Sequence, residues 1–380
     1  MATLRAEICK IHSVKPHPGA DRLEIVSVGG WDCIVPLGVH KPEEPVLYIP
    51  IDAALPDTLA EKIGVTKYLG RGNRVKAAKL RGQPSYGIVV KPETLGLSTV
   101  VGKDYTKKLG IVKWEPNRDI PQIPTIWTRL NKLRRFIKGS IYRLLGLQSK
   151  RETRRRSKRD QPQHPLFPIY TRIEHLRKNK DLLNGMEVIV TEKIHGTNSR
   201  TGLIKEGVEW KTVFGSHYSF NPGGPENKYY LPLTLEWVTN LLKFLSGKYP
   251  EAKNIILYGE IYGKGIQKLG YNSDQLAYRL IDIMIDFKYL SFLETLGLPI
   301  LSSQDVVPIL YKGTYDYDKV VELSKGRTTL NEAKHIREGV VVKPVSGEYH
   351  PRYGRLVFKH ASDDYLCGNF DEPTDEEDIS

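Results

Sequence analysis

Residues 186–198 read MEVIVTEKIHGTN, and this stretch decides how the second half of the chain is interpreted. The run MEVIV is short, apolar and rich in β-branched residues, a pattern that predicts a buried β-strand. Lys193 comes at the end of that strand, and Gly196 permits a turn in which a phosphate can approach the backbone. A lysine becomes nucleophilic when burial, nearby positive charge or a metal lowers its pKa. The stretch therefore predicts a reactive lysine, although Lys-x-x-Gly also occurs in ordinary surface turns.

Further acids and lysines follow in a fixed order along the chain. Glu260 lies in LYGEIYG, and Glu338 opens EGVVVKP, which contains Lys343; Lys359 lies in RLVFKH. Each of these segments has the composition of a β-strand. Carboxylates hold Mg²⁺ and lysines neutralise phosphate oxygens, so the set is suited to phosphoryl transfer with Lys193 as the attacking group. Each residue, taken alone, could equally be a turn-capping acid or a surface lysine.

Together these residues resemble the covalent nucleotidyltransferases, the superfamily of polynucleotide ligases and mRNA capping enzymes. The resemblance extends over roughly residues 166–362 and preserves the order of the motifs. The segments are 193–196 (motif I), Glu260 (motif III), 280–283 (motif IIIa), 338–343 (motif IV) and 355–359 (motif V).

The residue before the motif I glycine distinguishes among the classes of this superfamily. DNA ligases and capping enzymes usually carry Asp there, whereas this chain has His195. KIHGTN is similar to the form found in RNA ligases that seal nicked duplexes. An OB-like domain placed before the transferase domain further resembles the nick-sealing RNA ligase of the Deinococcus type. The resemblance implies an ATP-dependent RNA ligase that uses Mg²⁺ or Mn²⁺ and passes through lysyl-AMP and an adenylylated 5′-end.

The resemblance also implies roles for individual residues. Lys193 is the expected catalytic nucleophile, and Glu260 and Glu338 are the expected metal ligands. The expected nucleotide-binding set is Glu192, Lys193, Ile194, His195, Gly196, Asn198, Glu260, Ile281, Lys343 and Lys359.

Two positions depart from the family pattern. The candidate motif Ia segment contains His217 where the family often has Arg, and Val357 stands where motif V often has its first lysine. His217 and Arg355 are the expected substitutes as phosphate-binding side chains. The alternatives are an RNA-binding protein with an inactive transferase-like domain, a DNA ligase or a capping-type enzyme.

The first 115 residues predict a different kind of domain. AEICKIHSV, DRLEIVSVG, DCIVPLG and PVLYIPID are short apolar or alternating runs separated by Gly, Pro and Asp, which favours a small barrel or sandwich. Residues 11–28 resemble the opening of the tRNA-binding OB-folds of some aminoacyl-tRNA synthetases. The expected fold class is α+β: an antiparallel-sheet, ATP-grasp-like adenylation domain preceded by an all-β OB-like barrel.

The expected domain organisation is an OB-like domain at 1–115, a basic linker at 116–165, an adenylation domain at 166–368 and an acidic disordered tail at 369–380. Residues 126–160 contain thirteen Lys/Arg against two acids, and helical periodicity from Leu130 to Leu145 predicts an amphipathic helix there. The last ten residues contain six acids and no base. Together with the overall net charge of +13, this distribution favours a polyanionic partner, namely nucleic acid or an anionic membrane surface.

Composition limits the remaining possibilities. The 380 residues contain no apolar run long enough to span a membrane, and the first thirty lack the features of a signal peptide. The three cysteines follow no metal-ligand spacing. We therefore expect a soluble, intracellular protein, cytoplasmic or nuclear, and a monomer. The resemblance to RNA ligases implies that its partner is RNA or an RNA-containing nicked duplex.

Overall fold

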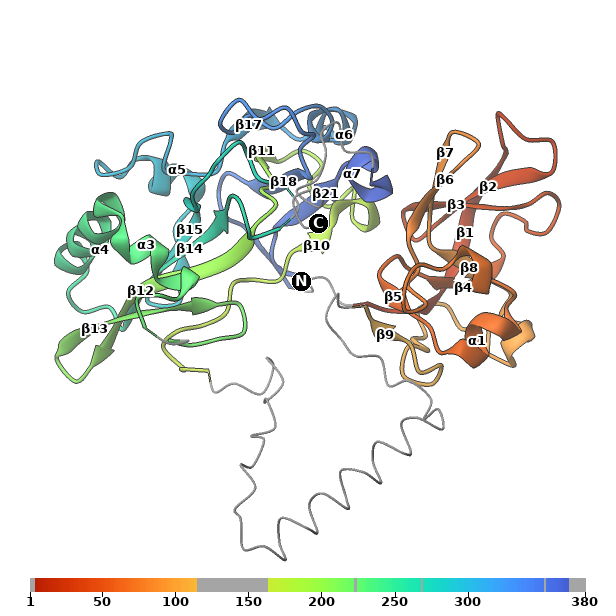
Figure 1. Cartoon of the computed structure of the whole chain (residues 1–380), viewed down its shortest axis with the longest axis horizontal. Helices are drawn as coiled ribbons and strands as arrows, with labels where there is room; N and C mark the ends of the chain where they lie inside the picture. Colours follow the sequence, from red (N-terminus) through yellow and green to blue (C-terminus); the bar gives the residue numbers. More distant parts are fainter. Residues whose placement is uncertain (1–3, 115–162, 222–223, 268, 352, 369–380) are drawn as a thin grey trace, which may run out of the picture.

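The computed structural model describes residues 4–114, 163–221, 224–267, 269–351 and 353–368 (Figure 1). The predicted linker helix and the predicted acidic tail lie outside these ranges. Within the described residues, none of the helices combines the length and the apolarity that a membrane crossing requires.

The N-terminal strands form a strongly bent antiparallel sheet in the order β3-β2-β1-β4-β8. The long strand β1 pairs with β2 through one part and with β4 through the other, with an irregularity between Ile11 and Ser13. Such a bulge bends a strand and lets one sheet curl towards a barrel. The strands are β1 (Glu7–Pro16), β2 (Leu23–Val28), β3 (Trp31–Pro36), β4 (Pro45–Ile49), β5 (Ala53–Ala54), β6 (Ala77–Leu80), β7 (Gln83–Tyr86), β8 (Ile88–Val90) and β9 (Val112–Lys113), with the short helix α1 (Asp57–Lys62).

The C-terminal half contains two five-stranded sheets, in the orders β10-β21-β18-β11-β17 and β13-β12-β14-β15-β16. All their strand pairs are antiparallel except β10 with β21. The strands are β10 (Glu174–His175), β11 (Glu187–Glu192), β12 (Thr197–Glu206), β13 (Glu209–Ser216), β14 (Asn254–Tyr262), β15 (Ala277–Ile285), β16 (Lys288–Tyr289), β17 (Ile309–Thr314), β18 (Gly339–Pro344), β19 (Tyr349–His350), β20 (Gly354–Arg355) and β21 (Phe358–Ala361). The helices are α3 (Leu231–Thr234), α4 (Glu236–Lys248), α5 (Phe292–Leu296), α6 (Tyr317–Ser324) and α7 (Asp363–Cys367).

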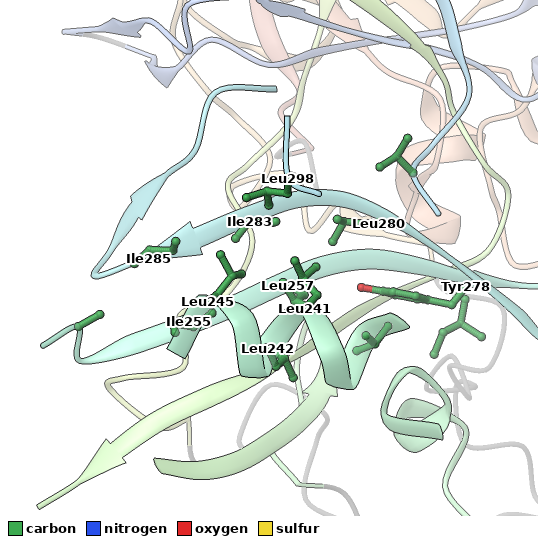
Figure 2. Packing of buried hydrophobic residues seen from close by; sticks show 14 residues of the cluster. Leu241, Leu242, Leu245, Ile255, Leu257, Tyr278, Leu280, Ile283, Ile285 and Leu298 are labelled. Atoms are coloured by element: carbon green, nitrogen blue, oxygen red, sulfur yellow. The ribbon is translucent and has the colours of Figure 1, made fainter. Parts of the chain in front are cut away.

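Helix α4 covers one face of the second of these sheets. Figure 2 shows Leu241 and Leu245 of the helix directed at Leu257 of β14 and Ile283 of β15, and all four are buried. Burial of such aliphatic side chains contributes roughly 1.5–3 kcal/mol each relative to exposure. The cluster therefore fixes β14 and β15, the strands that carry Glu260 and Asp282.

The two halves of the chain meet around Arg177. Its guanidinium lies over the rings of Trp31 and Tyr86, 4.8 and 5.2 Å from their centroids, and it forms an ion pair with Asp363. Gly30 lies against this residue so closely that an added Cβ would be 2.3 Å from the Arg177 carbonyl oxygen. Figure 1 shows α7 beside the β6–β7 hairpin, at the same junction.

Candidate active site

Lys193 lies where the chain leaves one sheet and enters the other. Strand β11 ends at Glu192, and the backbone N–H of Lys193 donates to the carbonyl of Gly339 at the start of β18. Strand β12 of the other sheet begins at Thr197. A Cβ on Gly196 would lie 2.3 Å from the Ile261 carbonyl oxygen, so only glycine fits this crossing.

The two predicted metal ligands meet at this lysine. Nζ of Lys193 lies 2.7 Å from Oε1 of Glu338, and the two side chains are only 24 and 13 % exposed. Glu260 is placed opposite Asn198 in the pairing of β12 with β14, and its charge acts on Lys193 and Glu338. The structure thus brings together residues separated by up to 145 positions in the sequence.

Electrostatics hold Lys193 in its charged form. Burial lowers the pKa of the lysine, but the negative charge of Glu338, together with that of Glu260 once it ionises, outweighs burial and the net direction is upward. Burial raises the pKa of Glu338, yet Lys193 and His195 lower it to about 2. Burial raises the pKa of Glu260 to about 8, so without a bound cation this carboxyl group retains its proton at neutral pH, and a divalent cation would favour its ionised form.

His195 is fixed by partners from both ends of the domain. Its Nδ1 lies 3.1 Å from Oε2 of Glu338 and 2.9 Å from the Tyr365 hydroxyl of α7, while its backbone N–H donates to the Tyr271 hydroxyl. Tyr271 and Tyr365 are functional candidates that the sequence did not reveal, because a tyrosine in a loop or a short helix carries no motif.

Lys359 is the second amine of the cluster. It lies on β21, opposite Val341 of β18, and burial together with the Lys193 cation lowers its pKa to about 8. Two partly buried amines near each other disfavour double protonation. Lys359 is therefore placed to meet negative charge that arrives at Lys193.

Lys343 and Arg355 lie elsewhere, around Asp282. Nζ of Lys343 is 2.8 Å from Asp282 Oδ1, and the Arg355 guanidinium donates twice to the same carboxylate at 2.8 and 2.9 Å. Tyr170 donates its hydroxyl to Asp282 as well. Burial raises the pKa of Asp282, but Lys343 and Arg355 outweigh burial and hold this pKa well below its usual range. In the structure both predicted phosphate contacts are engaged in a buried network that joins the two sheets.

The remaining predicted residues have separate surroundings. The Glu192 carboxylate accepts hydrogen bonds from Thr328 and Thr329, and Ile194 is buried in an apolar cluster. Ile281 is half-buried on β15, and its carbonyl accepts a bond from Lys343. His217 directly follows β13, whose last residue, Ser216, pairs with Ser199 of β12, so His217 lies near Asn198. Burial lowers the pKa of His217 to about 4. It is therefore neutral at pH 7.

The residues present suit a nucleotide and a divalent cation. The described residues contain no group of three His, Cys, Asp or Glu that could enclose a metal. Mg²⁺, however, is usually held by one or two carboxylates together with water and substrate phosphates, which fits Glu338 and Glu260. The side-chain oxygen of Asn198 is buried with no hydrogen-bond partner among the described residues, so an acceptor is available to a ligand.

Comparison with known proteins matches each part of the chain to a family model. Residues 186–360 match the family model described as RNA ligase. This segment is an RNA ligase domain. Residues 5–92 match the model of the PHA02142 OB-fold domain, which confirms the predicted OB-like start.

Solved structures share this fold. A Naegleria gruberi RNA ligase with pyrophosphate superposes with a TM-score of 0.71 at 21% identity, covering 97% of this chain and 99% of that one. A variant of that ligase with ATP and Mn superposes with a TM-score of 0.69 at 21% identity, covering 95% of this chain and 97% of that one. The predicted α+β fold class is confirmed.

One curated relative matches only part of the chain. The phenylalanine–tRNA ligase beta subunit of Chlorobium luteolum is 33% identical over 97 residues, which is 25% of this chain. The chain spans 11% of the length of that subunit.

Proposed function

We propose that the protein is an ATP-dependent RNA ligase that joins a 3′-hydroxyl to a 5′-phosphate at a break in an RNA-containing duplex. The observation that carries the proposal is the cluster of Lys193, Glu338, Glu260 and His195 within an RNA ligase domain. The similar Naegleria structures with ATP and Mn, or with AMP and Mn, support ATP and a divalent cation as cofactors.

The first step is attack by the Lys193 amine on the α-phosphorus of ATP. A P–N bond forms, the bond from the α-phosphorus to the bridging oxygen breaks, and pyrophosphate leaves. The amine must first lose a proton, and the Glu338 ion pair opposes that loss. A Mg²⁺ or Mn²⁺ ion held by Glu338 and Glu260 would supply positive charge that offsets these carboxylates and the phosphate oxygens. Without the unbalanced Glu338 charge, burial favours the neutral amine.

The two later steps transfer the nucleotide and then release it. An oxygen of the 5′-phosphate attacks the phosphorus of lysyl-AMP, and Lys193 leaves with a proton. The 3′-hydroxyl then attacks the 5′-phosphorus of the adenylylated end, the phosphodiester bond forms and AMP departs. Lys359 is placed to balance the charge that develops on the transferred phosphate.

The test is covalent labelling. The purified protein is incubated with α-labelled ATP or GTP and Mg²⁺ and separated under denaturing conditions. We expect labelling by ATP alone, and we expect Lys193→Ala to abolish it while Lys180→Ala, a lysine in the turn that precedes β11, retains it. Equal labelling of the Lys193→Ala protein would remove this lysine as nucleophile and the mechanism with it.

A further inference from the structure

The first and second parts of the OB-fold domain differ in net charge. Residues 4–61 contain five Lys/Arg and nine Asp/Glu, a net charge of −4. Residues 62–114 contain twelve Lys/Arg and only two acids, Glu93 and Asp104, a net charge of +10. From 62 to 81 there is no acid at all. The basic character of this half is separate from that of the predicted linker.

Two of these basic residues, Arg71 and Arg74, contact Trp114. The Arg74 guanidinium lies 4.1 Å from the centroid of the indole ring, and the indole N–H donates to the Arg71 carbonyl at 3.2 Å. A Cβ on Gly70 would be 2.2 Å from Cε of Lys76, so the Lys76 side chain lies directly against that glycine. Arg74 is anchored by Asp52 at 2.6 Å, whereas Arg71 and Lys76 are exposed.

This cluster borders the active site. Lys113 and Asp52 both act electrostatically on Lys359, and Arg74 acts on Tyr365, whose hydroxyl contacts His195. A neighbouring contact joins Lys79 to Asp364 of α7 at 3.7 Å. The positive surface therefore begins beside the residues that handle phosphate.

An exposed aromatic ring precedes the cluster in the sequence. Tyr68 is 65 % exposed in the short 3₁₀ helix Thr66–Tyr68, and the ammonium of Lys67 lies 5.0 Å from its ring centroid. An exposed ring beside cations is suited to stacking on a nucleobase, and base–aromatic stacking contributes roughly 1–3 kcal/mol.

We propose that the basic face of the OB-fold domain, formed by Lys67, Tyr68, Arg71, Arg74, Lys76 and Lys113, binds the nucleic-acid strand that leads away from the break held at Lys193. This inference rests on the proposed function and adds the surface that recognises the substrate. Arg74 and Lys113 contact the phosphates nearest to the break, and Arg71, Lys76 and Lys67 contact those farther along. Tyr68 stacks on a base where the duplex ends or frays.

The experiment uses the full chain and a matched pair of triple variants. One is Lys67→Glu/Arg71→Glu/Lys76→Glu; the other is Lys15→Glu/Arg22→Glu/Lys41→Glu, which makes the same charge change at exposed positions of the acidic half. Binding to a fluorescent nicked RNA duplex is measured without ATP between about 50 and 200 mM salt. Covalent labelling by ATP is measured first on every protein. Absence of labelling in the parent would contradict the proposed function, whereas normal labelling with unchanged duplex binding would contradict only the basic-face proposal.

We expect the basic-face variant to lose at least tenfold in affinity and its salt slope to fall by about 2.7, since each lost phosphate contact removes about 0.9. The control triple should bind as the parent does. Unchanged affinity of the basic-face variant, or an equal loss in both triples, overturns the proposal. So does unchanged duplex affinity accompanied by lost binding to phosphatidylserine vesicles.

Single variants at Tyr68 keep the proposal testable if the triple variant does not fold. Tyr68→Ala should weaken binding about fivefold or more, whereas Tyr68→Trp should retain it, because the tryptophan ring also stacks. Equal affinities of these two variants would overturn the stacking role of Tyr68.

Discussion

Nζ of Lys193 and Oε1 of Glu338 are 2.7 Å apart, so the expected nucleophile is ion-paired with an expected metal ligand. The same carboxylate that keeps the lysine protonated is one of the two suited to a divalent cation. Ligand binding and activation of the nucleophile therefore depend on one side chain.

Replacement of Glu338 by Ala should lower the rate of lysyl-AMP formation by about 10²-fold or more, because the divalent cation that stabilises the transferred phosphate loses a carboxylate ligand. The measurement is labelling by ATP across a Mg²⁺ and Mn²⁺ titration. Glu322→Ala, at an exposed carboxylate of α6, is the matched control and should label normally. Full labelling of Glu338→Ala at any metal concentration would place Glu338 outside the metal site.

Glu260 should make stability fall as the pH rises. Its pKa is raised to about 8 by burial, above the ordinary glutamate value, so its contribution is fully present below about pH 4.3 and is lost as the pH rises through about 8. Glu260→Gln should therefore flatten the decline in the free energy of unfolding over this window. Urea unfolding at pH 5 and pH 8 measures the difference. An identical decline in both proteins would contradict the buried, protonated state of Glu260.

Asp282→Asn should destabilise the ligase domain by about 3–5 kcal/mol, because Lys343 and Arg355 would remain buried without their anionic partner. The effect should shrink as the pH falls through the lowered pKa of Asp282, since the native carboxylate is then protonated as well. Urea unfolding is again the measurement. Asp274→Asn, at an exposed site before β15, should remain within about 0.5 kcal/mol of the parent.

Gly30→Ala should disturb the contact between the two domains. Gly30 has φ +81° and lies against the Arg177 backbone, whereas Gly38 has φ +75° and nothing within 4 Å of an added Cβ. Gly38→Ala therefore measures the effect of backbone strain alone. Any additional loss of activity in Gly30→Ala measures the effect of disturbing the contact with Arg177. We expect Gly30→Ala to reduce sealing of a nicked duplex several-fold more than Gly38→Ala does. Equal effects would show that the contact does not matter for sealing.

Local pattern correctly predicted the strands that carry the site. MEVIV became β11, LYGEIYG became part of β14 and EGVVVKP became β18, because each short run is apolar and bounded by turn residues, as buried strands are. The segment LPLTLEWVTNLLKFLSG has helical periodicity throughout, but its helix is divided at Leu235, whose backbone is extended between α3 and α4. GRLVFKH is likewise divided, into β20 and β21, with Leu356 and Val357 between them.

The partners of individual charges could not be predicted in the same way. Lys343 has the spacing of a phosphate-binding lysine, but its amine meets Asp282, which lies 61 residues earlier on the other sheet. Tyr365 reaches His195 from 170 residues away. Such contacts depend on how two sheets and two domains pack, and hydrophobic periodicity contains no information about that packing. The OB-fold basic face was missed because its charges are spread over fifty residues rather than gathered in one run.

Only Ile194 and His195 separate the last anchored residue of one sheet, Lys193, from the glycine that enters the other. Any displacement of one sheet relative to the other about this connection would also displace the Lys193 amine. The packing of the two sheets therefore sets the position of the nucleophile.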